Sequence, residues 1–350
     1  MSPLLARVLL FALSIAIVVL PLLPAIIELR LKRDATPLNV VQQHGGEIRH
    51  FAQGFQKYIS CLAGPIERCK ISGISAKGIM SDREPYLLVA RDDAGAVATG
   101  SDLVCRSVVA TVADATLPSG MTFTKEVYAV GQLAGGERSA FRAVLGESDV
   151  RLAPNTKVTR WLHAAGLLEV EKGSDLYGRV SSDREIRLHA DCTFQRLNAP
   201  RIRFGDFDEK AQVEGEIRSA SVQPRSLVDD DVHIEAGAHV SNNIVTRGKL
   251  HIGAGARISG SVKSYGHMHL DDSVHIEGSL VSTSTMTIGK RCKVAGPVIS
   301  EHELTMERGA QCGTLHHPTT VSALKVNVAE GVIVFGTVWA RNEGEVLSQT

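Results

Sequence analysis

Three consecutive rows of the sequence share one pattern, and this pattern decides the fold. They read LHIGAGARISGSVKSYGH (residues 250–267), MHLDDSVHIEGSLVSTST (residues 268–285) and MTIGKRCKVAGPVISEHE (residues 286–303). Apolar residues recur every eighteen positions, and one such column consists of Val232, Leu250, Met268, Met286 and Leu304. A fixed period of this length indicates a repeat architecture.

The spacing within each row identifies the repeat as a coil of short strands. Apolar residues come in pairs two positions apart, as in Leu250 and Ile252, and this alternation is typical of β-strands. Each row has two such apolar pairs and a third pair in which serine follows an apolar residue, as in Val262 and Ser264. Bends rich in Gly, Asp and Lys separate the pairs, and one corner is shared by Gly260, Gly278 and Gly296. We therefore predict a mainly β, triangular solenoid with about 18 residues per coil, each coil burying its inward side chains against the next.

The same columns extend in both directions and define the predicted domains. Upstream, coils start at Val150 and Leu168, the coil at Ile186 is about two residues short, and the coil from Ile202 carries a polar insertion at 223–231. Downstream, Leu324 and Val326 begin a last coil after a slip of two residues. The predicted division is an anchor with a basic flank (1–33), a helix and β-rich capping region (34–149), a solenoid (150–341) and a tail (342–350).

The amino-terminal segment is predicted to anchor the chain. Val8–Ile27 contains no charged residue, is long enough to cross a bilayer as a helix, and lacks the small-residue cleavage site of the alternative, a signal peptide. Arg30, Lys32 and Arg33 follow it, against Arg7 and the amino terminus ahead. This bias favours a cytoplasmic location for the rest of the chain.

Residues 34–149 are less regular. Apolar residues at helical spacing between 47 and 62 predict an amphipathic helix, which either packs on the following domain or lies against a membrane or partner. The predicted buried face of this helix consists of Ile48, Phe51, Ala52, Phe55, Ile59 and Leu62. Strand-like runs between 70 and 146 do not show the eighteen-residue register, so they form either a small α+β region or irregular capping coils.

Composition excludes several classes of function. The chain has 38 basic and 38 acidic residues and a net charge of zero, so no basic surface for nucleic acid is expected. No nucleophile elbow, zinc-protease or Walker motif is present, and we predict neither an enzyme nor a cofactor. Cys192, Cys292 and Cys312 fall in inward columns and are predicted core residues, whereas Cys61 and Cys69 are spaced for a disulfide in an oxidising compartment.

The histidines form the most conspicuous polar pattern. His233, His251 and His269 lie eighteen residues apart in an outward column, and His239 and His275 lie on an adjacent outward strand. Stacked imidazoles are able to share a metal ion, but no carboxylate or thiol is placed to complete a defined coordination sphere. Lys249 and Lys263 flank the column and would disfavour a cation. We therefore predict a solvated face and no metal site. The acidic residues near the insertion are likewise predicted to be solvated: Asp206, Asp208, Asp229, Asp230 and Asp231.

The rows from Leu250, Met268 and Met286 resemble bactofilins, a family of polymer-forming cytoskeletal proteins of bacteria. They contain the family's coil pattern Φ-x-Φ-(G/D)-x-x-Φ-x-Φ-x-G-x-Φ in full, where Φ is apolar, and the resemblance covers about residues 150–341. It implies a right-handed β-helix that polymerises end to end without nucleotide. It also implies attachment to the bacterial inner membrane, here as a single-pass protein, and a scaffold role that positions envelope proteins.

Two alternatives share the solenoid fold. A left-handed hexapeptide-type acyltransferase also has about eighteen residues per coil and would use His251 or His275 as its base. However, such repeats place an aliphatic residue where this chain has Thr246, Ser264, Ser282 and Ser300. A glycan-binding or glycan-cleaving β-helix is the second alternative, although the insertion contains no aromatic platform.

The carboxyl-terminal coil is the predicted surface for self-assembly. After Val338 only twelve residues remain, which is too short for a packed cap. Terminal solenoid coils leave backbone donors and acceptors unpaired, and these can pair with another strand. We therefore expect self-association between two exposed carboxyl ends through Val332, Val334, Phe335 and Val338.

Overall fold

The computed structural model describes residues 13, 19–22, 48–91, 94–97, 102–205 and 225–348. The chain divides into two units, Met1–Glu47 and Ile48–Thr350, and the strands of the described residues lie in the second. Among the described residues, no helix is long and apolar enough to cross a membrane. Most of the predicted anchor, Val8–Ile27, lies outside the described residues, which include only Leu13 and residues 19–22 of it.

The second unit is a β-solenoid of about 13 turns with about 18 residues per turn. The length of the turn is as the periodicity predicts. Its helical segments are α3 (His50–Ile59), η3 (Ser60–Leu62), α4 (Ala63–Ser72) and η4 (Ala94–Val97), and η1 (Leu20–Leu22) lies in the first unit. The strands before residue 206 are β1 (Ala76–Ile79), β2 (Pro85–Val89), β3 (Val104–Cys105), β4 (Val108–Thr111), β5 (Ala115–Thr116), β6 (Thr122–Ala129), β7 (Leu133–Gly135), β8 (Ala140–Gly146), β9 (Val150–Leu152), β10 (Lys157–Ala164), β11 (Leu167–Val170), β12 (Asp175–Ser182), β13 (Glu185–Leu188) and β14 (Thr193–Phe204).

The remaining strands follow residue 224. They are β15 (Arg225–Val228), β16 (Val232–Ile234), β17 (His239–Val240), β18 (Asn243–Thr246), β19 (Leu250–Ile252), β20 (Arg257–Ile258), β21 (Val262–Ser264), β22 (Met268–Leu270), β23 (His275–Ile276), β24 (Leu280–Ser282), β25 (Met286–Ile288), β26 (Lys293–Val294), β27 (Val298–Ser300), β28 (Glu303–Met306), β29 (Gln311–Cys312), β30 (Thr319–Ala329) and β31 (Ile333–Leu347).

The predicted eighteen-residue register is confirmed where it is most regular. Leu250 pairs with Val232 on one side and with Met268 on the other, in parallel ladders. The inward columns form one continuous core in which Leu250, Ile258 and Ile276 are at most 2% exposed. Three strands per coil, such as β19, β20 and β21, give the triangular section.

The column of hydroxyl residues is also inward, at the corner that follows each third strand. Ser264, Ser282 and Ser300 are fully buried, and each donates a hydrogen bond to a backbone carbonyl of the preceding coil. For Ser282 the acceptor is the carbonyl of Gly266, at 3.0 Å. Because these hydroxyls satisfy carbonyls that would otherwise be buried without a partner, a polar residue is compatible with this core position.

Residues 76–205 form a first stack of coils that starts earlier than predicted. Strand β6 pairs in parallel with β4 and β8, and Phe123 lies opposite Phe141. The eighteen-residue register is therefore present before Val150, and of the two alternatives for this region the capping coils are confirmed. The coil between Ile186 and Ile202 is two residues short, as predicted. The antiparallel hairpin of β1 and β2 begins the stack.

A helix explains why the early coils are hard to recognise. Ala52, Phe55 and Ile59 of α3 are buried in a second apolar cluster on the outside of the stack, against Leu145 and Trp161. Strands under the helix are thus apolar on both faces, which removes the alternation. The packing alternative for this helix is confirmed, although Phe51 of the predicted face is 48% exposed.

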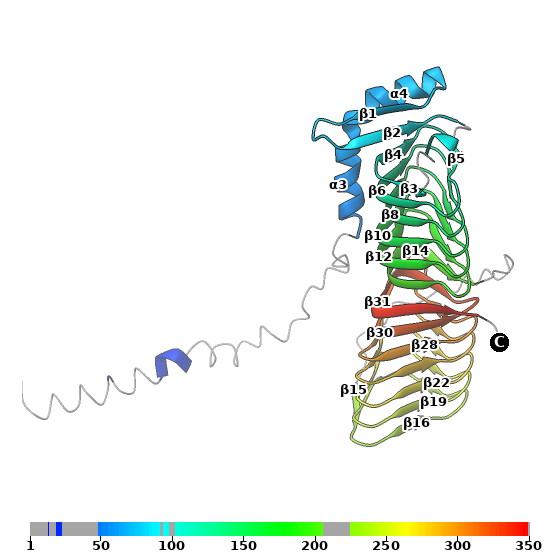
Figure 1. Ribbon diagram of the computed structural model, residues 1–350. Coiled ribbons are helices and arrows are strands. Elements are labelled where there is room, and N and C mark those ends of the chain that lie inside the picture. The colour runs from blue at the N-terminus through cyan, green and yellow to red at the C-terminus, as the bar shows by residue number, and fades with distance from the viewer. Residues whose placement is uncertain are drawn as a thin grey trace, which may run out of the picture. The chain divides into compact units, whose positions relative to one another are not determined.

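The chain reverses its direction of stacking between the two halves (Figure 1). The first stack ends at β14; residues 206–224 are not described; the second stack starts at β15–β16 at the far end and returns to the middle. There β31 pairs antiparallel with β14, with Leu197 opposite Val338 and Ile202 opposite Val334. The predicted single rod, with an insertion in the coil from Ile202, is therefore wrong. The chain forms two stacks joined at their carboxyl-terminal coils.

The junction between β14 and β31 is specific as well as apolar. The guanidinium of Arg196 lies 5.0 Å from the centre of the Trp339 ring, and that of Arg201 lies 5.8 Å from the Phe335 ring. Asn198 donates a hydrogen bond of 2.8 Å to the hydroxyl of Thr337. These contacts add cation–π and polar selectivity to the backbone ladder.

The expected exposure of the carboxyl-terminal coil is consequently wrong. Val332, Val334 and Val338 are fully buried and Phe335 is 8% exposed, because β14 of the same chain covers them. The predicted tail at 342–350 is also wrong, because β31 continues to Leu347. The predicted slip of two residues before the last coil is also wrong. Leu304 pairs with Val326 and not with Leu324, whose side chain is 44% exposed.

All six cysteines are free. Cys192, Cys292 and Cys312 are buried in the core as predicted, whereas Cys61 is exposed and Cys69 is buried without a bond between them.

A substitution in the core tests the register. Ile276→Asp places a carboxylate in a site that is 2% exposed, which we expect to cost several kcal/mol and to unfold the central coils. The matched change His275→Asp introduces the same residue on the opposite face of β23, where Arg257 and Lys293 are its register neighbours. It should alter stability by about 0.5 kcal/mol or less. Equal melting temperatures by circular dichroism would contradict the register.

A second substitution tests the reversal. A β-carbon on Gly344 would lie 2.3 Å from the ring of Phe194 in β14. Gly344→Val should therefore destabilise the fold by about 1–3 kcal/mol through overpacking. Combination with Phe194→Leu should cost less than the sum of the single changes, because the two residues are in contact. Additive effects, measured by denaturant unfolding, would mean that the two ends of the stacks do not meet.

Candidate functional site

Parallel register places three histidines in a ladder on the outer face of the second stack. His233 of β16, His251 of β19 and His269 of β22 are direct register partners. Their rings are stacked, with centroids 4.8 Å apart for the first pair and 5.4 Å for the second. The ladder is as predicted and follows from the eighteen-residue period, since adjacent coils lie about 4.8 Å apart.

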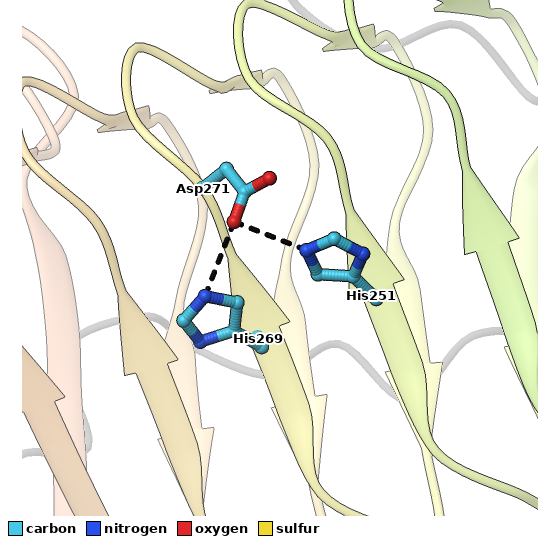
Figure 2. A group of neighbouring side chains, drawn as sticks. All are labelled: His251, His269 and Asp271. Atoms are coloured by element: carbon cyan, nitrogen blue, oxygen red, sulfur yellow. Dashed lines mark hydrogen bonds and ion pairs between the residues drawn. The ribbon is translucent and has the colours of Figure 1, made fainter.

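A carboxylate joins this ladder, contrary to the prediction that none is placed to do so. Asp271 lies two residues after His269, so strand alternation puts both side chains on the same face. One oxygen of Asp271, Oδ1, lies 3.0 Å from Nε2 of His251 and 3.2 Å from Nε2 of His269 (Figure 2). The prediction that no carboxylate is placed at the ladder overlooked Asp271, two residues further along the chain from His269.

The hydrogen bonds define the tautomers of the ladder. Nε2–H of His251 donates to Asp271, which leaves Nδ1 of His251 as an acceptor. Nδ1 of His233 lies 2.8 Å from this atom and is the donor. The hydrogen bond from His251 is the main reason why the pKa of the Asp271 carboxyl lies below its usual value. Because its pKa is lowered, the Asp271 carboxyl is ionised at neutral pH.

The cluster is accessible to solvent. The side chains of His251, His269 and Asp271 are 40%, 42% and 35% exposed. Within the described part of the chain, the ion-pair partners of Asp271 are these two histidines. The Nε2 atoms and Oδ1 all lie within 4.8 Å of one another, a separation that allows them to contact one ion.

A similar group in the first stack differs in charge. Glu169, Glu171 and His189 also converge within 4.8 Å. However, Nη2 of Arg151 lies 2.5 Å from Glu171, and Nε of the same guanidinium lies 3.6 Å from Glu169. Because the Arg151 guanidinium already pairs with both carboxylates, this group is a structural ion-pair network.

The other candidate residues are not brought together. His275 lies on β23, a different side of the triangle from His251, and Nδ1 of His275 lies 3.2 Å from the carbonyl of Ser273. Burial lowers the pKa of His275. Asp229 forms an exposed ion pair with Arg247, as expected for a solvated residue, whereas Asp206 and Asp208 lie outside the described residues.

The end of the second stack is a further candidate for function. Strands β15, β16 and β17 are its outermost strands, and each pairs with a single described strand, β18, β19 and β20 respectively. Leu227 of β15 is 58% exposed and Val228 is 36% exposed. Among the described residues, this end therefore has the unpaired edges and exposed apolar residues that we expected at the carboxyl-terminal coil.

Comparison of the chain with protein-family models, with curated proteins and with solved structures found no match. The class of the protein is therefore defined by its fold, a β-solenoid of two oppositely directed stacks with a histidine ladder.

Proposed function

We propose that the chain is a membrane-tethered scaffold of the bactofilin kind, a right-handed solenoid that associates with copies of itself and positions envelope proteins. The observation that carries this proposal is the open end formed by β15, β16 and β17. Unpaired strand edges are templates for further strands, and natural β-proteins normally cover them. At the opposite end of the unit the β1–β2 hairpin and α4 lie over the first coils (Figure 1).

The junction within the chain is a template for contact between two copies. At the junction, residues 196–199 of β14 pair antiparallel with residues 336–339 of β31. Both segments lie on the side of the triangle that contains β18, β21, β24 and β27. At the open end, the strand on this side is β15. A second copy that binds in the same manner therefore pairs its β15 antiparallel with β15 of the first copy.

The backbone and charges of β15 suit such a pairing. The carbonyl of Val228 accepts a hydrogen bond from the backbone N–H of Arg247, inside the stack. Because backbone groups alternate along a strand, the N–H and carbonyl of Leu227 point to the free edge. A two-fold axis through Leu227 places Arg225 of each copy opposite Asp229 of the other. Opposite charges in cross-strand positions are favourable, and an isologous contact closes as a dimer.

The amino-terminal segment completes the proposal. Val8–Ile27 tethers the scaffold to the bacterial inner membrane as a single-pass helix, with the solenoid on the cytoplasmic side. The observations that support this are the uncharged length of the segment and the basic residues that follow it. Recruited envelope proteins would then be held at the membrane surface.

Leu227→Lys tests the assembly surface. The change places two like charges opposite each other on the two-fold axis, so the full chain in mild detergent should sediment as a smaller species than the wild type. Leu315→Lys is the matched control, since Leu315 is 52% exposed and lies outside the open end. The control should keep the wild-type size. A monomeric wild type at high concentration, or unchanged size in Leu227→Lys, would contradict the proposed contact.

Carbonate extraction tests the anchor. The full chain should remain with the membrane pellet at alkaline pH, because a spanning helix resists extraction while peripheral contacts do not. A chain that lacks residues 1–33 should appear in the supernatant. Recovery of the intact protein in the supernatant, or mature protein that begins after residue 24, would disprove tethering by this segment.

A further inference from the structure

We propose that His251, His269 and Asp271 form a binding site for a divalent transition-metal ion of the Zn²⁺ type, with two imidazole nitrogens and one carboxylate oxygen as ligands. The three ligands lie outside the open end, on the two coils that follow β16, and their convergence does not depend on self-association. It arises from two adjacent strands, β19 and β22, whose register is set by the solenoid core.

The distances match the needs of such an ion. Zn²⁺ binds imidazole nitrogen and carboxylate oxygen at about 2.0–2.2 Å, so neighbouring ligand atoms of a tetrahedral site lie about 3.3 Å apart. Oδ1 of Asp271 lies 3.0 Å and 3.2 Å from the two Nε2 atoms. An ion can enter with small side-chain rotations, because the strands already hold the three ligand atoms on one face (Figure 2).

The proton balance is also favourable. In the metal-free state Nε2 of each histidine lies within 3.2 Å of Asp271 Oδ1, and an ionised carboxylate favours the tautomer with the proton on that nitrogen. Binding requires the tautomer with the proton on Nδ1. His251 can then donate from Nδ1 to Nδ1 of His233, which lies 2.8 Å away, while His233 moves its own proton to Nε2, 3.7 Å from Glu235. The change is a shift of tautomers, and no proton is lost from the ladder.

His233 is therefore a positioning residue for the metal site. Ligating histidines usually donate their second N–H to a neighbouring acceptor, which fixes the ring and raises its basicity. His233 provides this acceptor from the adjacent coil, and its ring stacks on that of His251 at 4.8 Å. The third member of the ladder thus has a function in the site without contact to the ion.

The ligand set selects the kind of ion. Imidazole nitrogen suits Zn²⁺, Co²⁺, Ni²⁺ and Cu²⁺, whereas Ca²⁺ and Mg²⁺ prefer sites of oxygen alone. Each ligand side chain is at least 35% exposed, so water can complete the coordination and the ion can exchange. The group at Glu169, Glu171 and His189 offers a contrast, because Arg151 occupies the position of the cation.

The test is metal binding by the full chain in detergent, produced without a histidine tag. Zn²⁺ affinity is measured by competition with a chromophoric chelator, and Co²⁺ is used for its visible absorption. The wild type should bind one ion per chain, and Co²⁺ should give the absorption of a nitrogen- and oxygen-coordinated site. His269→Gln and Asp271→Asn should abolish this spectrum and weaken Zn²⁺ binding at least tenfold.

Two further variants separate a built site from general surface binding. His233→Gln should weaken Zn²⁺ binding about tenfold while the Co²⁺ spectrum persists, as expected for loss of a partner outside the coordination sphere. His239→Gln removes an exposed histidine of β17 outside the cluster and should change nothing. All variants should melt at the wild-type temperature without metal. Equal affinity in wild type, His269→Gln and Asp271→Asn, or no binding by the wild type, would overturn the proposal.

Discussion

The hydrogen bonds between successive coils are the interaction on which this structure depends. Each coil buries its inward side chains only against its neighbours, and each backbone ladder needs a strand on both sides. A solenoid must therefore cover the core and pair the free strand edges at every end coil. This chain solves the problem at one place by turning the end of one stack against the end of the other, so that β14 and β31 satisfy each other. The same requirement underlies the contact between copies that we propose at β15–β17.

The parts of the fold that could be predicted are those in which core packing dictates the sequence. Between Val232 and Met306 the inward positions accept only apolar residues and the corner hydroxyls, so the register is visible without a structure. In the early coils, Leu145 and Trp161 face outward into the cluster with α3, and the alternation is lost. The reversal was not predictable in this way, because parallel coils have the same inward pattern whichever way the next stack runs.

The same reasoning explains what was found and missed at the histidine ladder. The column of His233, His251 and His269 follows from the repeat alone. Asp271 belongs to a different column, and its approach to His251 depends on a side chain that reaches across to the neighbouring coil. A periodic sequence thus predicts which residues stack, whereas diagonal contacts between columns require coordinates. Repeats favour sites of this kind, because a histidine that recurs on a neighbouring coil brings two ligands together.

The antiparallel junction also sets an order of events during synthesis. Contacts inside each stack join residues about one coil apart, whereas Asn198 and Thr337 are separated by 139 positions. The first stack can form as it leaves the ribosome, but the outer edge of its last strand, β14, lacks the partner β31 until the final residues of the chain are made. During this interval β14 is an exposed edge that accepts any suitable strand. Arg196 and Arg201, which later lie over Trp339 and Phe335, leave positive charge on that edge and disfavour premature pairing between nascent chains.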